Sequence, residues 1–324
     1  MSGQHHGGGH GRERGRSLAL HLGVLVLLAG LQFVLPEYHH VSLARIMVLA
    51  SFALGYNVLF GYTGLLSLGH AMFFSAGLYG TGLAMQHLGW PASTALVAGI
   101  VCGLGLAVLI GLLALRTSGV SFMIVTLMFA QTGYLTILYF GTYTRGDEGF
   151  VIQQAARQIA GFDLTDPTIR YFAALALLAL CIAVKLTLVL SPTGRVLVAI
   201  RENEARTRML GYDPMRYKLL ALAVSGMLAG AAGAMYALLF GYVGASFASI
   251  QYSIYPLLWV LLGGAGTVLG PLVGTTLMFY LVDLTSSITS AYLMVVGVAL
   301  VVLVLFAPRG LLGIVRERLV PWLP

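Results

Sequence analysis

Long apolar stretches with almost no charge recur along this sequence, and they limit what the chain can fold into. A helix needs about 20 apolar residues to cross a bilayer. Most of the ten stretches are long enough for this, although the eighth is short. They cover residues 17–35, 41–60, 64–86, 92–114, 119–140, 170–190, 218–243, 250–264, 267–285 and 290–306.

Composition excludes the other fold classes. Of the 324 residues, 59% are hydrophobic and only 9% are charged, whereas a soluble domain carries roughly 25% charged residues. A soluble enzyme, a disordered chain and a disulfide scaffold are therefore excluded. The sequence predicts an all-α fold, a polytopic membrane helical bundle with about ten transmembrane or re-entrant segments.

The lysines and arginines lie mostly on one side of this predicted bundle. With the N-terminus threaded inside, 14 of the 18 fall in cytoplasmic segments. The four on the other side are Arg45, Arg145, Arg157 and Arg170. This asymmetry follows the positive-inside rule, and it predicts that both termini are cytoplasmic. The net charge of +7 is then a topological signal, and nucleic-acid binding is the weak alternative.

The polar segments divide the chain. Residues 1–16 are Gly-rich and contain three histidines, and we expect a flexible cytoplasmic tail there. A transmembrane domain over residues 17–310 and a short cytoplasmic tail over residues 311–324 follow. Two long connections lie on opposite faces, an external loop over residues 141–170 and a cytoplasmic loop over residues 191–218. In the external loop, Asp166 followed by Pro167 predicts the start of a helix.

The cytoplasmic loop has the signals of a short helix. Ser191-Pro192 and Asp213-Pro214 are typical of helix starts, and Gly211 is typical of a helix end. Glu202 and Glu204 each precede an arginine by four residues, a favourable spacing for ion pairs. A rigid helix between two spans is suited to transmitting force from a cytoplasmic partner. The alternative is a solvated amphipathic connector. The apolar contacts that this helix would present are Ile200, Met209 and Leu210.

Two apolar stretches are interrupted by several glycines, at residues 61–70 and 262–271. Non-helical backbone at membrane depth is tolerated only beside protein or a water-filled cavity, and such broken segments point to a transport pathway. Close packing of helices through small residues is the alternative explanation. The glycines that we expect along the pathway are Gly64, Gly69, Gly263, Gly266 and Gly270.

A few polar side chains fall inside the spans, and such groups usually face the bundle interior or a cavity. Each is also a candidate for an ordinary hydrogen bond between helices. The candidates for the substrate pathway are Asn57, Ser67, His70, Thr126 and Gln131. We expect His70 to be a packed neutral side chain and predict no metal site, because no second ligand lies at a suitable spacing.

The motifs that are absent from the sequence help to choose between possible transport mechanisms. Apart from Asp283, near an outer end, no carboxylate lies inside an apolar segment, which argues against ion coupling. The sequence has no Gly-Lys-Ser/Thr phosphate loop and none of the common hydrolase motifs. We therefore predict a protein that is not an enzyme, holds no cofactor and takes its energy from a separate subunit. A secondary transporter or a channel is the alternative in another class.

Several short motifs lie along the chain: GLLSLGHA at 64–71, Thr126-Leu127 with FAQ at 129–131, GRVL at 194–197, AIRENEA at 199–205, Gly211-Tyr212 with Tyr217-Lys218, LGGAGT at 262–267 with Gly270-Pro271, and PRGL at 308–311. Each motif alone would be weak, but the combination is specific. Together, from about residue 41 to residue 313, they resemble one known family, the inner-membrane permease subunits of bacterial ABC importers for branched-chain amino acids.

The resemblance implies a pathway for leucine, isoleucine and valine in the bacterial inner membrane. It also implies ATP and Mg on two cytoplasmic ATP-binding subunits, a second homologous permease and a periplasmic substrate-binding protein. Very similar permeases serve urea and short-chain amides, and they are the runner-up. The resemblance implies that the cytoplasmic loop contacts the ATPase through Arg201, Glu202, Glu204, Arg206, Arg208 and Gly211.

This chain departs from the family pattern in two places. Arg206 replaces the second alanine of the Glu-Ala-Ala…Gly loop of importer permeases. In the external loop, where a Thr-Gly-Gly stretch is frequent, Arg145, Asp147 and Glu148 place charge on the expected docking face. The binding protein that docks there would differ from a typical one.

Overall fold

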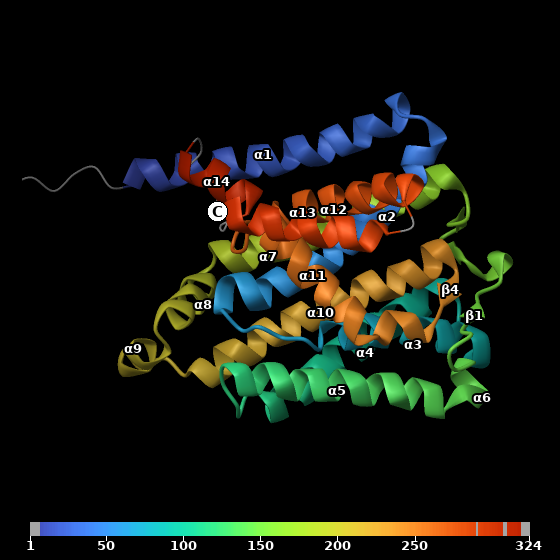
Figure 1. The fold of residues 1–324 in the computed structure, drawn as a ribbon, viewed down its shortest axis with the longest axis horizontal. Helices are drawn as coiled ribbons and strands as arrows, with labels where there is room; N and C mark the ends of the chain where they lie inside the picture. Colours follow the sequence, from blue (N-terminus) through green and yellow to red (C-terminus); the bar gives the residue numbers. More distant parts are fainter. Residues whose placement is uncertain (1–6, 290, 307–309, 319–324) are drawn as a thin grey trace, which may run out of the picture.

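The computed structural model describes residues 7–289, 291–306 and 310–318. These residues form a bundle of helices with a few two-residue strands at one end (Figure 1). The first half contains α1 (Gly7–Val34), α2 (Glu37–Asn57), the π-helical η1 (Val58–Tyr62), α3 (His70–Leu88), α4 (Ala92–Ala114), α5 (Val120–Tyr139) and α6 (Gly141–Thr144). The outer connection contains β1 (Phe150–Val151), η2 (Gln154–Ala156), β2 (Gln158–Ile159) and β3 (Phe162–Asp163). The second half contains α7 (Pro167–Leu190), α8 (Pro192–Glu202), α9 (Glu204–Met209), α10 (Pro214–Phe240), β4 (Tyr242–Val243), η3 (Ala245–Ala248), α11 (Ile250–Gly263), α12 (Gly270–Ile288), α13 (Tyr292–Phe306) and α14 (Leu311–Arg318).

The helical bundle predicted from the apolar stretches is confirmed, since each of the ten stretches contains a helix. Within the described ranges, six helical segments are long and apolar enough to cross a membrane: α2 with η1, α4, α5, α7, α10 and α12. Two shorter apolar helices are Leu18–Val34 of α1 and α11. The count of about ten membrane segments therefore stays a prediction.

The two long connections lie at opposite ends of the bundle (Figure 1). Helices α8 and α9 mark one end, here called the inner end, and β1 and β4 mark the other, the outer end. Helix α14 and the start of α1 also lie at the inner end (Figure 1). Both described chain ends thus share a side with residues 191–218, as the charge asymmetry requires. Helix α1 already begins at Gly7, inside the segment expected to be a tail, and α14 occupies part of the expected C-terminal tail.

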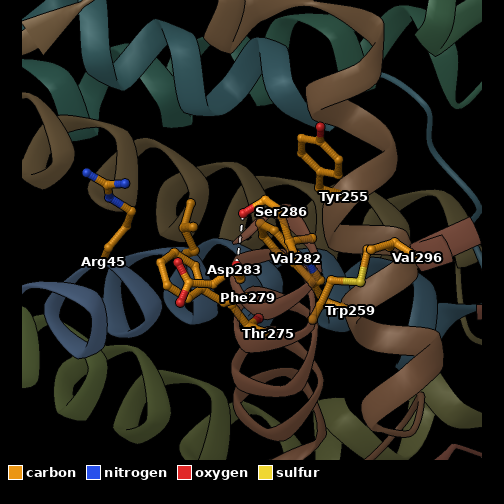
Figure 2. Close-up of a pocket in the computed structure, with 11 residues that line it drawn as sticks. Arg45, Tyr255, Trp259, Thr275, Phe279, Val282, Asp283, Ser286 and Val296 are labelled. Atoms are coloured by element: carbon orange, nitrogen blue, oxygen red, sulfur yellow. Dashed lines mark hydrogen bonds between the residues drawn. The ribbon is translucent and has the colours of Figure 1, made fainter. Parts of the chain in front are cut away.

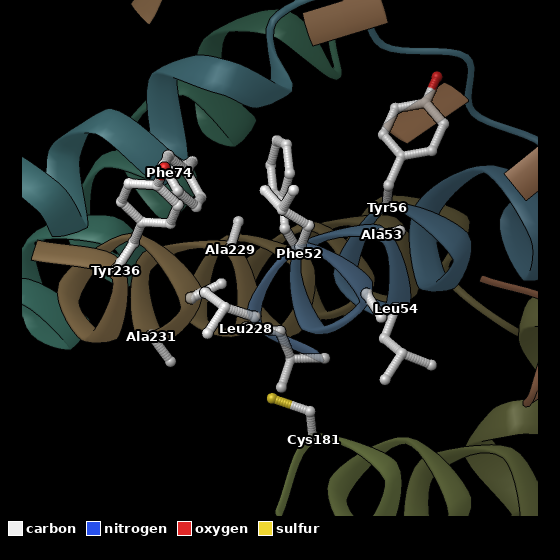
Figure 3. Packing of buried hydrophobic residues seen from close by; sticks show 14 of the residues in the cluster. Phe52, Ala53, Leu54, Tyr56, Phe74, Cys181, Leu228, Ala229, Ala231 and Tyr236 are labelled. Atoms are coloured by element: carbon white, nitrogen blue, oxygen red, sulfur yellow. The ribbon is translucent and has the colours of Figure 1, made fainter. Parts of the chain in front are cut away.

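Helix α2 forms the centre of the core, with 89% of its most apolar window buried. It packs against α7, α10, α11 and α12. Phe52 on α2 lies against Phe74 of α3, with ring centroids 4.9 Å apart, and Phe74 in turn contacts Tyr236 of α10 (Figure 3). These aromatic contacts tie the first and second halves of the chain into one core.

Glycines allow α3, α4 and α10 to cross at very short distance. A Cβ atom placed on Gly77 of α3 would collide with the backbone of Gly230 on α10, and one placed on Gly103 of α4 would lie 2.6 Å from the same residue. Small residues at such crossings replace side-chain packing by direct backbone contact.

Helices α2 and α10 end in nearly the same sequence, LFGYTG at residues 59–64 and LFGYVG at residues 239–244. Helix α2 runs toward the inner end, whereas α10 runs toward the outer end (Figure 1). After each helix the chain leaves the α-helical conformation and then starts a new helix, α3 or α11. Two oppositely directed helices thus lead into similar sequences, and our sequence analysis did not detect this similarity.

Candidate functional site

The first predicted break lies between α2 and α3. Residues 64–69 are not helical, and α3 begins only at His70. Gly64 has a φ of 72°, in the left-handed region that favours glycine. The carbonyl of Ser67 accepts a hydrogen bond from the Tyr56 hydroxyl at 3.0 Å, and the Gly69 amide donates to Ser67 Oγ at 3.2 Å. Protein groups thus satisfy part of the polar backbone of the break, and membrane depth favours this.

The second predicted break, residues 264–269, lies between α11 and α12. Asn57, the last residue of α2, connects it to the first break. Its Nδ2 donates to the carbonyl of Thr267 at 2.7 Å, and its Oδ1 accepts from the amide of Gly266 at 3.0 Å. Asn57 is fully buried. Asn57 is 210 residues from Thr267 and 209 residues from Gly266 in the sequence, so two distant segments meet at one side chain.

Three cations complete this meeting point by donating to backbone carbonyls. Lys185 of α7 is fully buried, and its Nζ lies 3.2 Å from the carbonyl of Thr267. Arg316 of α14 donates to the carbonyl of Gly266 at 3.4 Å, and Arg201 of α8 donates to the carbonyl of Gly61. Carbonyls at helix ends lack partners within the helix and carry partial negative charge. We call Asn57, Lys185, Arg201 and Arg316, with the carbonyls they bind, the inner cluster.

A similar arrangement stands at the outer end of α10. Arg157 donates to two carbonyls of the last turn of α10, at 3.4 and 3.5 Å. The guanidinium groups of Arg45 and Arg170 lie 5.2 and 6.0 Å from the ring of Phe240, within cation–π distance. Burial, together with the nearby charge of Arg170, lowers the pKa of Arg157. Three of the four arginines assigned to the outer side therefore gather at one helix end.

The outer connection is folded rather than open. Strand β1 pairs antiparallel with β4, which lies just beyond α10. The Asp163 carboxylate accepts hydrogen bonds from the amide and the hydroxyl of Thr165, both at 2.8 Å, and these bonds lower its pKa. The predicted helix start is confirmed, because Asp166 accepts from the amides of Thr168 and Ile169. The connection is thus fixed to the second half of the bundle.

Three of the predicted pathway residues, Ser67, His70 and Thr126, lie at the first break. His70 is fully buried, stacks on Phe52 at 5.3 Å and lies 3.4 Å from the Ser225 hydroxyl. Thr126 of α5 accepts from the amide of Leu68 at 3.3 Å. Asn57 and Ser67 are also buried, whereas Gln131 is half-buried on α5. Most of these buried groups bond to protein in this conformation, although His70 Nδ1 has no hydrogen-bond partner among the described residues, and their contact with substrate stays a prediction.

The predicted single helix of the cytoplasmic loop is a pair of helices, α8 and α9, and this corrects our expectation. Asn203 stands between them with an extended backbone, φ −160° and ψ 100°. Its side chain accepts from the amide of Arg206 at 2.9 Å and so starts α9. The spacing of Glu202 to Arg206 therefore crosses a helix boundary, and no ion pair joins them in the described structure. The sequence signal was Asn203 itself, a favoured N-cap residue that we overlooked.

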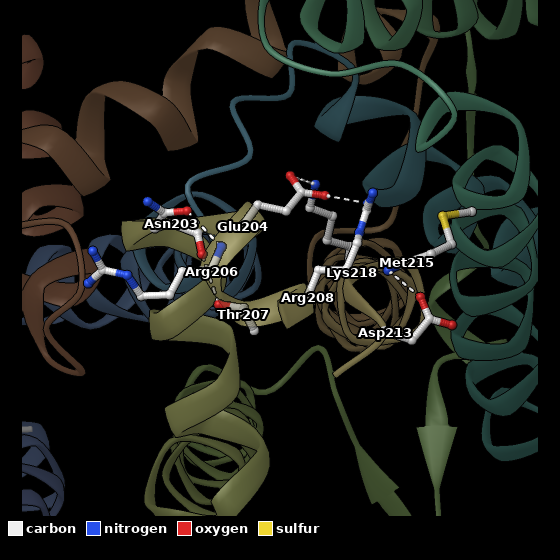
Figure 4. A network of polar contacts seen from close by, with 8 residues as sticks. All are labelled: Asn203, Glu204, Arg206, Thr207, Arg208, Asp213, Met215 and Lys218. Atoms are coloured by element: carbon white, nitrogen blue, oxygen red, sulfur yellow. Dashed lines mark hydrogen bonds and ion pairs between the residues drawn. The ribbon is translucent and has the colours of Figure 1, made fainter. Parts of the chain in front are cut away.

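The other features of this loop agree with the sequence. Ser191 and Asp213 cap α8 and α10, and Gly211 follows α9 with a φ of 89°. Glu204 pairs with Arg208 at 3.7 Å, as predicted, and more closely with Lys218 at 2.6 Å (Figure 4). The latter contact ties α9 to the first turns of α10.

The tip of the loop exposes apolar side chains. Met209 is 84% exposed and Leu210 is 71% exposed, whereas Ile200 is buried against the bundle. Arg206 and Arg208 lie beside them and are also exposed. An apolar pair framed by cations, projecting from the inner end, is a surface that a partner protein would cover.

Comparison with known proteins places these features in one family. Residues 41–306 match the family described as "Branched-chain amino acid transport system / permease component". The chain is 30% identical over 297 residues to the high-affinity branched-chain amino acid transport system permease protein LivM of Escherichia coli K12, covering 84% of this chain and 69% of that protein. The Salmonella typhimurium LivM protein is 29% identical over the same shares. A probable LivM permease of Methanocaldococcus jannaschii is 34% identical over 85 residues, 26% of this chain and 25% of that protein. No solved structure matches the chain.

Proposed function

The chain belongs to the permease-component family of branched-chain amino acid transport systems, and from this premise we propose how it works in its importer. It is a multi-pass membrane protein that forms the translocation pathway for leucine, isoleucine and valine, driven by ATP hydrolysis on other subunits. The proposed location is the inner membrane of a bacterium. The match over residues 41–306 is the observation that carries this function.

Its partners are those of an ABC transporter. In the assembly that we propose, this permease pairs with a second homologous permease, two cytoplasmic ATP-binding subunits and a periplasmic substrate-binding protein. ATP and Mg are held by the ATP-binding subunits, and the chain itself carries out no catalysis. The support within this chain is the exposed tip of α9, where Met209 and Leu210 protrude beside Arg206 and Arg208.

The inner cluster gives this assembly a route for coupling. A subunit that moves α8 and α9 would act on Gly61 through Arg201, and Asn57 would carry the displacement to residues 264–269. Both breaks in the membrane helices would then respond to one movement at the inner end. The roles of Glu202, Glu204, Arg206, Arg208 and Gly211 in this coupling belong to the same proposal.

Uptake by the reconstituted importer tests the function. The permease is placed in vesicles with its partner permease, its ATP-binding subunits and its binding protein. ATP-dependent accumulation of labelled leucine is measured, with urea and acetamide as the competing substrates. We expect leucine, isoleucine and valine to accumulate and the neutral amides to be left outside. Accumulation of urea or acetamide without leucine would overturn the substrate assignment in favour of the amide importers, and ATP-independent accumulation would exclude this mechanism.

A further inference from the structure

A cavity of about 380 Å³ opens between α2, α11, α12 and α13 toward the outer end (Figure 2). Its size falls in the range of pockets that hold small molecules, roughly 300–1,000 Å³. We call it the outer pocket. The side chains that matter for its chemistry are Arg45, Tyr255, Trp259, Met278, Val282 and Asp283.

The outer pocket carries one cation and one anion that do not pair with each other. Arg45 on α2 lies over the ring of Phe240 and has no ion pair or hydrogen bond with the described residues. Asp283 on α12 likewise has no cationic partner in that part of the chain. Arg45 is exposed and Asp283 is half-buried, both near the outer ends of their helices, so both charges are accessible to a ligand that enters from that end.

The carboxylate of Asp283 is held in place. The hydroxyl of Tyr38, on the first turn of α2, lies 2.9 Å from Asp283 Oδ1 and 2.8 Å from Oδ2. A tyrosine hydroxyl donates a single hydrogen, and an ionised carboxylate offers about four acceptor sites. Most of the acceptor capacity of Asp283 therefore stays free for a ligand, while the position of the group is fixed.

Apart from Thr275 and Ser286, the remaining wall is mostly apolar. Trp259 of α11 and Met278 of α12 are each 6% exposed, and the rings of Tyr255 and Trp259 stack at 5.9 Å. Val282, one residue before Asp283, lines the pocket from the same helix as Met278. In Figure 2 the carboxylate of Asp283 and the side chain of Arg45 lie on one side of the pocket, and Trp259 and Val296 lie on the other. A ligand that fits has two opposite charges at one end and an apolar group at the other.

We propose that the outer pocket binds a zwitterionic amino acid with a branched apolar side chain on its way through the membrane. Arg45 donates to the α-carboxylate, Asp283 accepts from the α-ammonium, and the side chain packs against Trp259, Met278 and Val282. This inference rests on the proposed function and deepens it, because it gives the permease a substrate site of its own. A neutral amide such as urea carries no charge for Arg45 or Asp283 to bind, so it would gain neither contact in the outer pocket.

Protection of an introduced thiol tests the proposal without the binding protein. Val282→Cys is combined with Cys102→Ser, since Cys102 is exposed and Cys181 is buried. The intact complex of permeases and ATP-binding subunits is placed in lipid nanodiscs, and the rate of modification by a water-soluble thiol reagent is measured. Leucine at ten times its Kd leaves about a tenth of the sites free, so the rate falls about tenfold. Isoamylamine, which lacks the carboxylate, 4-methylpentanoate, which lacks the ammonium, and acetamide protect far less at equal concentration.

Two pairs of variants test whether Arg45 and Asp283 bind the charged groups of leucine. Arg45→Gln and Asp283→Asn abolish protection by leucine, whereas Arg145→Gln and Glu37→Gln, matched changes at the outer end outside the pocket, retain it. Equal protection by leucine in all four variants, or none in the parent, overturns the outer pocket. Leucine uptake by the parent is measured in parallel. Uptake without protection rejects the pocket and leaves the proposed function intact, while protection by leucine without ATP-driven uptake retains the pocket and rejects that function.

Discussion

Arg201 of α8 donates a hydrogen bond to the backbone carbonyl of Gly61, where α2 leaves the regular helix. This single contact joins the cytoplasmic loop to the most buried helix of the bundle. The same guanidinium lies close to Gly266 in the second break, where a Cβ atom would be 3.2 Å from its Nη1. Gly266 has a φ of 77°, so both backbone conformation and space reserve this position for glycine. Arg201 is therefore placed to move both breaks at once.

Replacing Arg201 tests this link directly. In Arg201→Ala the Gly61 carbonyl loses a charged hydrogen-bond donor. In Arg201→Lys a compact ammonium group replaces the planar guanidinium group. A hydrogen bond to a charged group is worth about 1.5–3 kcal/mol, so we expect leucine uptake to fall about tenfold or more in Arg201→Ala. ATP hydrolysis should continue without the stimulation that substrate-loaded binding protein gives.

Arg195 provides the matched control for this measurement, because it lies exposed on the same helix. Arg195→Ala should keep both uptake and stimulated hydrolysis near those of the parent. If Arg201→Ala transports leucine as well as Arg195→Ala does, the contact with Gly61 has no part in coupling.

A second prediction concerns Gly69, at the end of the first break. A Cβ atom at this position would collide with the backbone carbonyl of Thr126 on α5. Because backbone cannot yield as a flexible side chain can, we expect Gly69→Ala to separate α5 from α3 and to reduce the amount of assembled complex. Gly105→Ala is the control, since nothing lies within 4 Å of a Cβ at Gly105. Abundance is measured by purification of the complex from membranes, and normal yield of Gly69→Ala would show that this contact is loose.

The sequence was informative where a residue acts on its own neighbours. Apolar runs predicted helices, and Asp166, Ser191 and Asp213 predicted helix starts that the structure confirms. Gly211 likewise predicted a helix end. In each case the signal lies within a few residues of the helix end that it determines, so the local sequence was enough to predict that helix end.

Contacts between distant segments were not predictable in this way. We counted Lys185 only as a charge that orients the chain and Arg201 also as an expected contact to the ATPase, yet both bind carbonyls of broken helices far away in the sequence. Asn57 was recognised as a polar candidate, but its partners in residues 264–269 follow only from the packing of α2 against α11 and α12. The repeated LFGY sequences at residues 59–62 and 239–242 were visible in the sequence, but the opposite directions of the helices before them were not.

The orientation of the bundle in the membrane is a third prediction. The charge asymmetry requires the inner end to face the cytoplasm. Met209 is 84% exposed at the inner end and Phe162 is 63% exposed at the outer end, so cysteines at these positions are accessible to reagents. In intact cells an impermeant thiol reagent that reaches the periplasm should label Phe162→Cys and leave Met209→Cys unmodified until the membrane is opened. The reverse pattern would invert the proposed topology.

The last prediction separates the two partners of Glu204 in the loop at the inner end. Lys218 has an 8% exposed side chain and lies 2.6 Å from Glu204, whereas Arg208 is 70% exposed at 3.7 Å. Glu204→Gln removes the charge opposite a nearly buried ammonium, so we expect a loss of about 1–3 kcal/mol in the free energy of unfolding. Arg208→Ala removes an exposed helix pair and should cost at most about 0.5 kcal/mol. Glu202→Gln, at a position where no ion pair forms in the described structure, serves as the neutral control.

A double-mutant cycle makes the assignment quantitative. If Glu204 acts mainly through Lys218, Glu204→Gln combined with Lys218→Met should cost less than the two single changes added together, because neither charge is then left without its partner. Thermal unfolding of the purified complex in detergent gives the stabilities, and leucine uptake is measured beside it. The Lys218 pair fixes α9 against α10, so Glu204→Gln should weaken coupling as well as stability, while Arg208→Ala should lower stability by no more than about 0.5 kcal/mol. Additive losses in the cycle would show that Glu204 and Lys218 contribute independently, and that their ion pair does not fix α9 against α10.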